Sequence, residues 1–250
     1  MLVSSEACAQ KHNQSAIVLE QDSLLLGPIT VVVSALALKI TAKRSGLVIV
    51  SKSPDWRVSG FNSRTKKIFT TSFKEYSAAR ANGTQSIFTA FHGFTLSDVP
   101  LEKCGPATFF NYAVQNFKAS ESFQRRMEQR RKTEKINGST PENVNYQILN
   151  LPVYSAPECN ILARTTGCAE LSRIPLTLIY TGTDKKPHNW LVTTSIKKTQ
   201  VTDKEFAIPN DYTAVKSEPM VNQTEATAEG VMDLFETGQH RLRDKLFIKE

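Results

Sequence analysis

The side chains that could carry nucleophilic or metal chemistry are four cysteines and four histidines in a chain of 250 residues. The cysteines form no Cys-x-x-Cys pair, and no histidine is placed with them at the spacing of a zinc site. The chain also lacks the Gly-x-Ser-x-Gly, His-Glu-x-x-His, Gly-x-Gly-x-x-Gly and Gly-x-x-x-x-Gly-Lys motifs of common enzymes. The sequence therefore predicts no catalytic residue, no bound metal and no cofactor.

One thiol keeps an enzymatic alternative open. Cys104 in "LEKCGPATFF" precedes a stretch with helical spacing, and a helix dipole lowers the pKa of a thiol at its start. His92 in "TAFHGF" is the only histidine within an apolar segment. A cluster of both residues with a carboxylate would indicate a thiol enzyme or hydrolase. A small buried cysteine and a hydrogen-bonded structural histidine are the simpler interpretations.

The other cysteine pair has a structural interpretation. Cys159 and Cys168 could close the short loop "CNILARTTGC". In an oxidising compartment this possible disulfide would add roughly 2–3 kcal/mol to stability in the chain-entropy model. In a reducing cytosol both residues would remain free thiols, and the sequence leaves the two cases open.

The net charge of +7 is moderately basic, and much of it lies in residues 118–135, where seven Lys or Arg accompany three Glu. A solvated helix face explains this run, because Glu121–Arg125 and Glu128–Lys132 have the stabilising i,i+4 spacing. The functional alternative is weak contact with an anionic membrane surface through five cations: Arg125, Arg126, Arg130, Arg131 and Lys132. No aromatic residue interleaves with them for base stacking, so nucleic-acid binding is not expected.

Short apolar runs separated by turn residues dominate the rest of the chain. The most apolar of them, residues 24–38, is too short for the roughly 20 residues that span a bilayer, and it is rich in β-branched residues. Four consecutive strands are expected in "TVVVSALALKITAK", "LVIVSK", "WRVSGF" and "KIFTTSF", which together make an antiparallel meander. Further strands are expected in "NYQILNLPVYS", "RIPLTLIYTG" and "NWLVTTSIKKTQV".

Helices are expected in three places. Residues 107–135 carry Phe109, Tyr112, Ala113, Phe117 and Met127 in one stripe at helical spacing, which indicates a helical or loop-rich insertion. A short helix begins near Pro157, and an amphipathic helix covers residues 224–238. The fold class predicted is α+β, a long antiparallel sheet with helices packed on one side. A flexible segment at 1–15 precedes a single domain at 16–250, with the helical insertion around 100–172.

The long apolar strands raise the question of whether the interior is hollow or filled. A curled sheet can enclose an apolar cavity that needs no catalytic residue to bind a ligand, and an ordinary filled core is the alternative. In this interpretation Trp56, Val58 and Gly60 share one face, and Gly60 leaves space beside the indole for the edge of a ligand. The predicted ligand-binding residues are Val31, Val33, Leu36, Leu38, Val48, Val50, Trp56, Val58, Leu176, Leu178 and Trp190.

Two stretches of the sequence resemble a known family. "SALALKITAKRSGLVIVSKSPDWRVSGFNSRTKKIF" and "WLVTTSIKKTQVTDKEFAIPNDYTAVKS" are similar to the entry and closing segments of bacterial lipoprotein carriers of the LolA, LolB and LppX type. The resemblance implies a half-barrel capped by helices that binds an acyl chain or a lipoprotein. It also implies an exported or periplasmic, envelope-associated protein, although no signal peptide is visible in this chain.

Three hypotheses about function follow. The first is a non-enzymatic envelope protein whose concave sheet holds a hydrophobic ligand. The second is a structural or protein-interaction module of the same fold with a filled core, and the third is a thiol enzyme or hydrolase. Packed side chains in place of a cavity would favour the second hypothesis, and a Cys104–His92 cluster would favour the third.

Overall fold

A meander of six antiparallel strands forms one half of the protein in the computed structural model, which describes residues 13–78, 95–134, 140–151, 154–216 and 221–222. Each strand pairs with the next one along the chain, and short turns join them. The strands are β1 (Gln14–Ser23), β2 (Gly27–Ser34), β3 (Ala37–Ala42), β4 (Leu47–Lys52), β5 (Arg57–Asn62) and β6 (Lys67–Thr71).

A second antiparallel group completes one continuous sheet of 12 strands. Its members are β7 (Leu101–Phe109), β8 (Tyr112–Ala119), β9 (Pro141–Leu149), β10 (Ile174–Gly182) and β11 (Pro187–Val201). The short β12 (Thr213–Ala214) pairs with β6 in parallel. The strand order is β12-β6-β5-β4-β3-β2-β1-β11-β10-β9-β8-β7, so the sheet has two free edges and does not close into a barrel.

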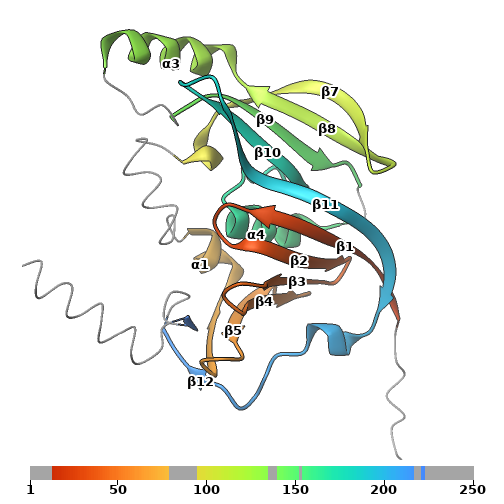
Figure 1. Cartoon of the computed structure of the whole chain (residues 1–250). Helices are drawn as coiled ribbons and strands as arrows, with labels where there is room; N and C mark the ends of the chain where they lie inside the picture. Colours follow the sequence, from red (N-terminus) through yellow and green to blue (C-terminus); the bar gives the residue numbers. More distant parts are fainter. Residues whose placement is uncertain (1–12, 79–94, 135–139, 152–153, 217–220, 223–250) are drawn as a thin grey trace, which may run out of the picture.

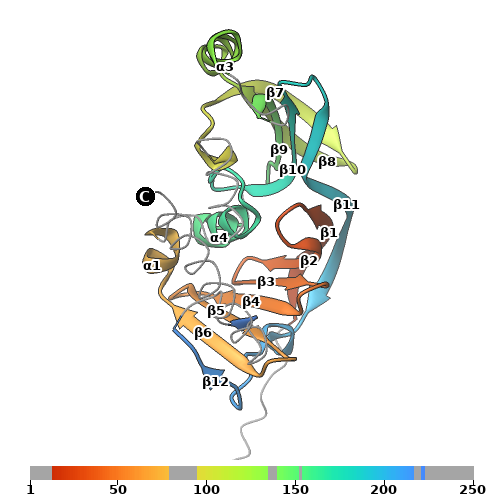
Figure 2. The ribbon, with the colours of Figure 1, turned by 60° about the vertical axis from the view of Figure 1, so that its left-hand side comes forward.

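The helices lie on one side of this sheet. Figures 1 and 2 show the strands curving around α4 (Ala156–Thr166) and α1 (Phe73–Ala78), while α3 (Glu121–Thr133) packs beside β9 at the far end. Two single turns of 3-10 helix, η1 (Leu96–Asp98) and η2 (Asp203–Phe206), complete the described elements. The predicted fold class, a curved antiparallel sheet with helices on one side, is confirmed. None of the described helices is long and apolar enough to cross a membrane.

Strand β11 joins the two halves because it pairs with β1 along one side and with β10 along the other. It has 15 residues and carries an extra residue at two points, at Trp190 opposite β10 and at Thr194 opposite β1. Such bulges bend a strand and re-aim its side chains. Here the first bulge directs Trp190 toward α4, where the indole Nε1 donates a hydrogen bond of 2.8 Å to the carbonyl oxygen of Thr166.

Alternation along the meander separates two apolar faces. The concave face carries Ile17, Leu19, Val31 and Ile40, all almost completely buried. The convex face carries a smaller cluster, on which η2 lies against β3 and β4. Its buried members are Ala16, Val32, Ala37, Val50, Phe61 and Phe206. Both faces are therefore apolar in the middle of the meander, which explains why β2 and β4 are near-continuous hydrophobic runs.

Two predictions about elements are wrong. Residues 30–43 form two strands, with a turn that leaves Leu36 58% exposed. Residues 107–119 belong to β7 and β8, and only residues from Glu121 onward are helical. Pairing with β9 decided the second case, because tertiary contacts can override a helical spacing of apolar residues. The helix expected at 224–238 lies outside the described residues.

The space expected beside Gly60 is filled by the ring of Phe69. These residues are directly opposite each other on β5 and β6, and a Cβ atom added to Gly60 would lie 2.0 Å from Cε1 of Phe69. Glycine is thus required by a close aromatic contact across the strands. Trp56 lies in the turn before β5 with φ 50°, so it does not share an alternating face with Val58 and Gly60.

Gly60→Ala is expected to lower the free energy of unfolding by about 1–3 kcal/mol, because the new methyl group overpacks the Phe69 ring. Urea unfolding of the variant measures this. Ser59→Ala on the opposite face of the same strand is the matched control. In a Phe69→Leu background the effect of Gly60→Ala should be clearly smaller; an equal effect in both backgrounds would contradict this account of the glycine.

Candidate functional site

The concave face of the sheet is the first candidate site. Its inner-face cluster consists of buried apolar side chains from the meander, β8, β9, β10, α1 and α4, the α4 members being Cys159, Ile161 and Leu162. Its largest strand-borne part consists of Ile17, Leu19, Ile29, Val31, Val33, Leu38, Ile40, Ala42, Leu47, Ile49, Val58 and Phe69. At its margin lie half-buried apolar side chains that include Phe73, Phe109 and Tyr112. An arrangement of this kind offers dispersion contacts and water exclusion, the chemistry that an apolar ligand uses.

The structure brings together five of the eleven predicted ligand-binding residues. Val31, Val33, Leu38, Val58 and Leu176 belong to the inner-face cluster. The other six lie elsewhere. Leu178 and Trp190 belong to the neighbouring cluster under β9 and β10, and Val48 and Val50 lie on the convex face. Leu36 and Trp56 lie in turns. Strand alternation explains Val48 and Val50, since Leu47 and Ile49 take the inward positions of β4.

The neighbouring cluster is anchored by hydrogen bonds from aromatic side chains. The Tyr146 hydroxyl donates to the carbonyl oxygen of Ala169 at 3.0 Å, in parallel with the bond from Trp190 to Thr166. Burial raises the pKa of Tyr146 well above its ordinary value, so the phenol stays neutral. Because its indole donates to Thr166, the last residue of α4, Trp190 fixes the end of this helix to the sheet.

Helix α4 is the main element over the concave face, and its ends are well defined. It begins with a capping box in which Ser155 and Glu158 satisfy each other's backbone groups, and it ends at Gly167 in the left-handed conformation. The Tyr76 hydroxyl of α1 and Oγ1 of Thr165 are 2.8 Å apart, which ties the two helices together. The two helices thus form one cover, which we call the helical cover.

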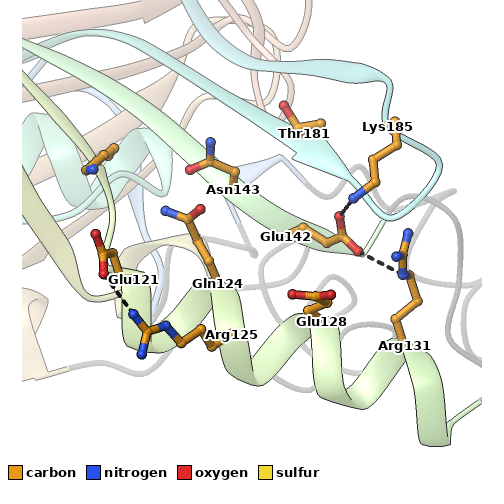
Figure 3. A pocket seen from close by; sticks show the side chains of 10 residues that line it. Glu121, Gln124, Arg125, Glu128, Arg131, Glu142, Asn143, Thr181 and Lys185 are labelled. Carbon is orange, nitrogen blue, oxygen red and sulfur yellow. Dashed lines mark hydrogen bonds and ion pairs between the residues drawn. The ribbon is translucent and has the colours of Figure 1, made fainter.

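A second candidate site is a polar pocket of about 650 Å³ between α3 and the ends of β9 and β10. Figure 3 shows Glu142 at its centre, paired with Arg131 at 3.5 Å and with Lys185. The Glu142 side chain is only 11% exposed, so this carboxylate is fixed between two cations. The remaining lining residues are Lys118, Glu121, Gln124, Arg125, Glu128, Asn143 and Thr181. The positive and negative charges of the lining largely compensate one another. The pocket is therefore best explained as the place where α3 is attached to the sheet.

The basic run on α3 is largely neutralised by carboxylates. Arg125 pairs with Glu121 and Lys132 with Glu128, which confirms both predicted i,i+4 pairs. Arg130 and Arg131 also form ion pairs, with Glu134 and Glu142, whereas Arg126 lies 5.5 Å from the ring centroid of Phe123. Membrane contact through these five residues stays a prediction.

Of the two cases that the sequence leaves open for Cys159 and Cys168, the structure has the free thiols. Cys159 and Cys168 are both free and buried, in two different apolar clusters. Most of the segment that such a bridge would close belongs to the continuous helix α4, whose rise of about 1.5 Å per residue separates the two positions. Cys104 is exposed on β7 with no helix directly after it. His92 lies outside the described residues, and within those residues no group of three or more His, Cys, Asp or Glu could hold a metal.

Sequence reasoning missed the pocket and the hairpin between β7 and β8. Glu142 and Lys185 are 43 positions apart, and only the pairing of β9 with β10 brings them together. The hairpin did have a local signal, because Asn111 after two phenylalanines is a residue that turns favour.

Neither a protein-family model nor a curated protein sequence matches the chain. Among solved structures, an uncharacterized conserved protein from Thermus thermophilus aligns with 83% of this chain and 92% of its own, at 11% identity and TM-score 0.39. The lipoprotein LppX of Mycobacterium tuberculosis aligns with 76% of this chain and 85% of its own, at 14% identity and TM-score 0.27.

A third match is a domain described as a putative outer membrane lipoprotein-sorting protein from Vibrio parahaemolyticus. It aligns with 78% of this chain and 87% of its own, at 10% identity and TM-score 0.24. The family that the two sequence stretches resemble is thus represented among the structural matches. At these identities and TM-scores, the likeness carries no argument about function.

Burial raises the pKa of the Cys159 and Cys168 thiols from 9.0 to about 12. Both thiols therefore ionise at a lower pH in the unfolded chain than in the folded protein. Their contribution to stability is intact below pH 9 and is lost as the pH rises toward 12, because deprotonation then favours the unfolded chain. The free energy of unfolding should therefore fall over this range, and Cys168→Ala should weaken that dependence. Urea unfolding as a function of pH measures it.

Alkylation of the native protein followed by peptide mapping is an independent check. Cys104 should react with iodoacetamide, whereas Cys159 and Cys168 should react only after unfolding. Recovery of a linked Cys159–Cys168 peptide from protein purified without reductant would contradict the free, buried thiols.

Proposed function

We propose that this chain is a non-enzymatic, envelope-associated protein that binds the acyl chain of a lipid or lipoprotein against the concave face of its sheet. The observation that carries the proposal is a mismatch between the size of the apolar concave face and the size of the helices that cover it. A broad apolar face is covered, within the described residues, by two short helices.

Simple geometry gives the scale of the mismatch. Six strands at the usual spacing of roughly 4.8 Å make the meander about 24 Å wide. Helix α1 has 6 residues and α4 has 11, which gives lengths of about 9 Å and 16 Å at the usual rise. Helices of about 10 Å diameter cover only part of such a face. A flexible alkyl chain suits such a face because it is apolar and adapts its shape.

The composition of the face supports an acyl chain over a polar metabolite. The strand-borne side chains of the inner-face cluster are Val, Ile, Leu, Ala and Phe, without a charged group. The buried polar side chains beside it serve the sheet: Gln21 donates to the carbonyl oxygen of Pro175, and Thr193 donates to that of Leu176. The resemblance of two sequence stretches to lipoprotein carriers implies the same ligand class.

One observation favours the second hypothesis, an interaction module with a filled core. Val31, Val33, Leu38, Val58 and Leu176 are all fully buried. Buried side chains of this kind line either a filled core or a closed ligand space, so occupancy has to be measured directly.

Native mass spectrometry of protein purified from its own host is the decisive measurement. We expect a mass above that of the bare chain, and organic extraction should release an acyl-containing molecule. Adding the extract back to delipidated protein should raise its thermal unfolding temperature. Recovery of the bare mass alone, together with an unfolding temperature that lipid extracts do not change, would favour the filled core.

Tyr76→Phe should increase the rate at which a bound fluorescent fatty acid is released, because it removes the hydrogen bond within the helical cover. A hydrogen bond of this kind contributes about 0.5–1.5 kcal/mol, so an increase of roughly threefold to tenfold is expected. Stopped-flow displacement measures the rate. Tyr212→Phe is the matched control, since Tyr212 packs on the convex face against Phe61. Equal release rates in both variants would argue against the helical cover as the gate.

A further inference from the structure

The hairpin between β7 and β8 ends in residues that the needs of folding do not explain. Phe109 pairs with Tyr112, which leaves Phe110 and Asn111 as a two-residue loop. Both loop residues have positive φ, 47° and 63°. This loop type favours Asn-Gly, and a bulky side chain fits poorly in the left-handed conformation. Phenylalanine at position 110 therefore works against local stability, which points to a role outside folding.

The side chain of Phe110 also stands out into solvent. It is 48% exposed, and its ring centroid lies 4.7 Å from that of Phe109 in an edge-to-face arrangement. Phe109 and Tyr112 are half-buried at the margin of the inner-face cluster. Figure 1 shows the hairpin reaching out beyond the end of β9. An aromatic surface therefore runs from solvent at the hairpin to the edge of the concave face.

One lysine accompanies these aromatic rings. Nζ of Lys198, an exposed residue of β11, lies 5.7 Å from the ring centroid of Tyr112. Lys198 has no ion-pair partner among the residues for which the structure gives a placement. This distinguishes it from the cations of α3, which are mostly paired with carboxylates.

We propose that this aromatic tip, formed by Phe109, Phe110, Tyr112 and Lys198, docks the protein on the surface of an anionic phospholipid bilayer. Phe110 enters the interface between headgroups and acyl chains, where aromatic rings are favoured, and Lys198 lies among the lipid phosphates. The purpose of the contact rests on the proposed function, because the tip borders the face that would receive or deliver an acyl chain.

The size of the surface favours a membrane over a protein partner. A stable protein interface buries about 800 Å² on each partner, far more than a single exposed ring and one lysine provide. A weak and reversible membrane contact needs only a small apolar anchor with nearby positive charge. The tip is also separate from α3, which begins beyond the opposite end of β8, about 25 Å away along the strand.

The test is flotation of the full chain with vesicles of phosphatidylcholine, alone or mixed with phosphatidylglycerol. Phe110→Gly removes the ring and suits the left-handed backbone, so the variant should be at least as stable as the wild type. Its vesicle-bound fraction should nevertheless fall at least about fivefold. Lys198→Gln should lower binding to the anionic vesicles and weaken its salt dependence, whereas Lys197→Gln, on the opposite face of β11, should change both less.

Leu36→Ser is the matched control, because Leu36 is also an exposed apolar residue in a turn. Its vesicle binding should equal that of the wild type. Unchanged binding by Phe110→Gly would overturn the proposal, as would an equal loss in Leu36→Ser. Absence of vesicle binding together with Phe110-dependent capture of a purified protein would overturn it too, and would make the tip a protein contact. A chain that carries no lipid by native mass spectrometry but needs Phe110 for vesicle binding would overturn the proposed function and leave this inference standing.

Discussion

The antiparallel pairing of β1 with β11 is the interaction on which the rest of the structure depends. It joins the meander of β1 to β6, built from the first third of the chain, to strands that follow residue 100. The register runs from Gln14 opposite Val201 to Ser23 opposite Leu191, interrupted by the bulge at Thr194. At this junction β10 turns away from β11, and the side chains of Gln21 and Thr193 take up the carbonyl groups left there. Without this pairing, the apolar faces of the two halves would not meet under α4.

The bulges of β11 also explain why the sheet is curved and how its cover is held. A bulge strengthens the local twist, and two of them in one strand bend the sheet around the helices. The bulge at Trp190 directs the indole onto the carboxyl end of α4, and the Tyr76–Thr165 hydrogen bond attaches α1 to the same helix. The helical cover is therefore held by polar contacts at its ends and by apolar packing, because Ile161 and Leu162 of α4 are completely buried in the inner-face cluster.

Charge and aromatic surface are distributed differently at the two ends of β7 and β8. At one end, most cations of α3 are paired with carboxylates, and the pair between Arg131 and Glu142 attaches the helix to β9. At the other end, Phe110 is exposed, and Lys198, which has no carboxylate partner in the described chain, lies 5.7 Å from the ring of Tyr112. The positive charges of α3 are thus mostly used in ion pairs within the protein, whereas the positive charge near the hairpin is available for contacts with other molecules.

The sequence by itself determined the fold class, most strands of the sheet, and the helix that begins near Pro157, because alternation, turn residues and capping are local signals. It also indicated two ion pairs of α3, Glu121–Arg125 and Glu128–Lys132, whose partners are four residues apart. It could not determine that residues 107–119 are strands or that Leu36 belongs to a turn, since their apolar spacing fits more than one element. Only the tertiary structure decided which apolar residues face the concave side, that Phe69 fills the space beside Gly60, and that Glu142 meets Lys185. Each of these depends on strand register between distant segments, and a shift of one residue reverses every side chain, so no local pattern contains the answer.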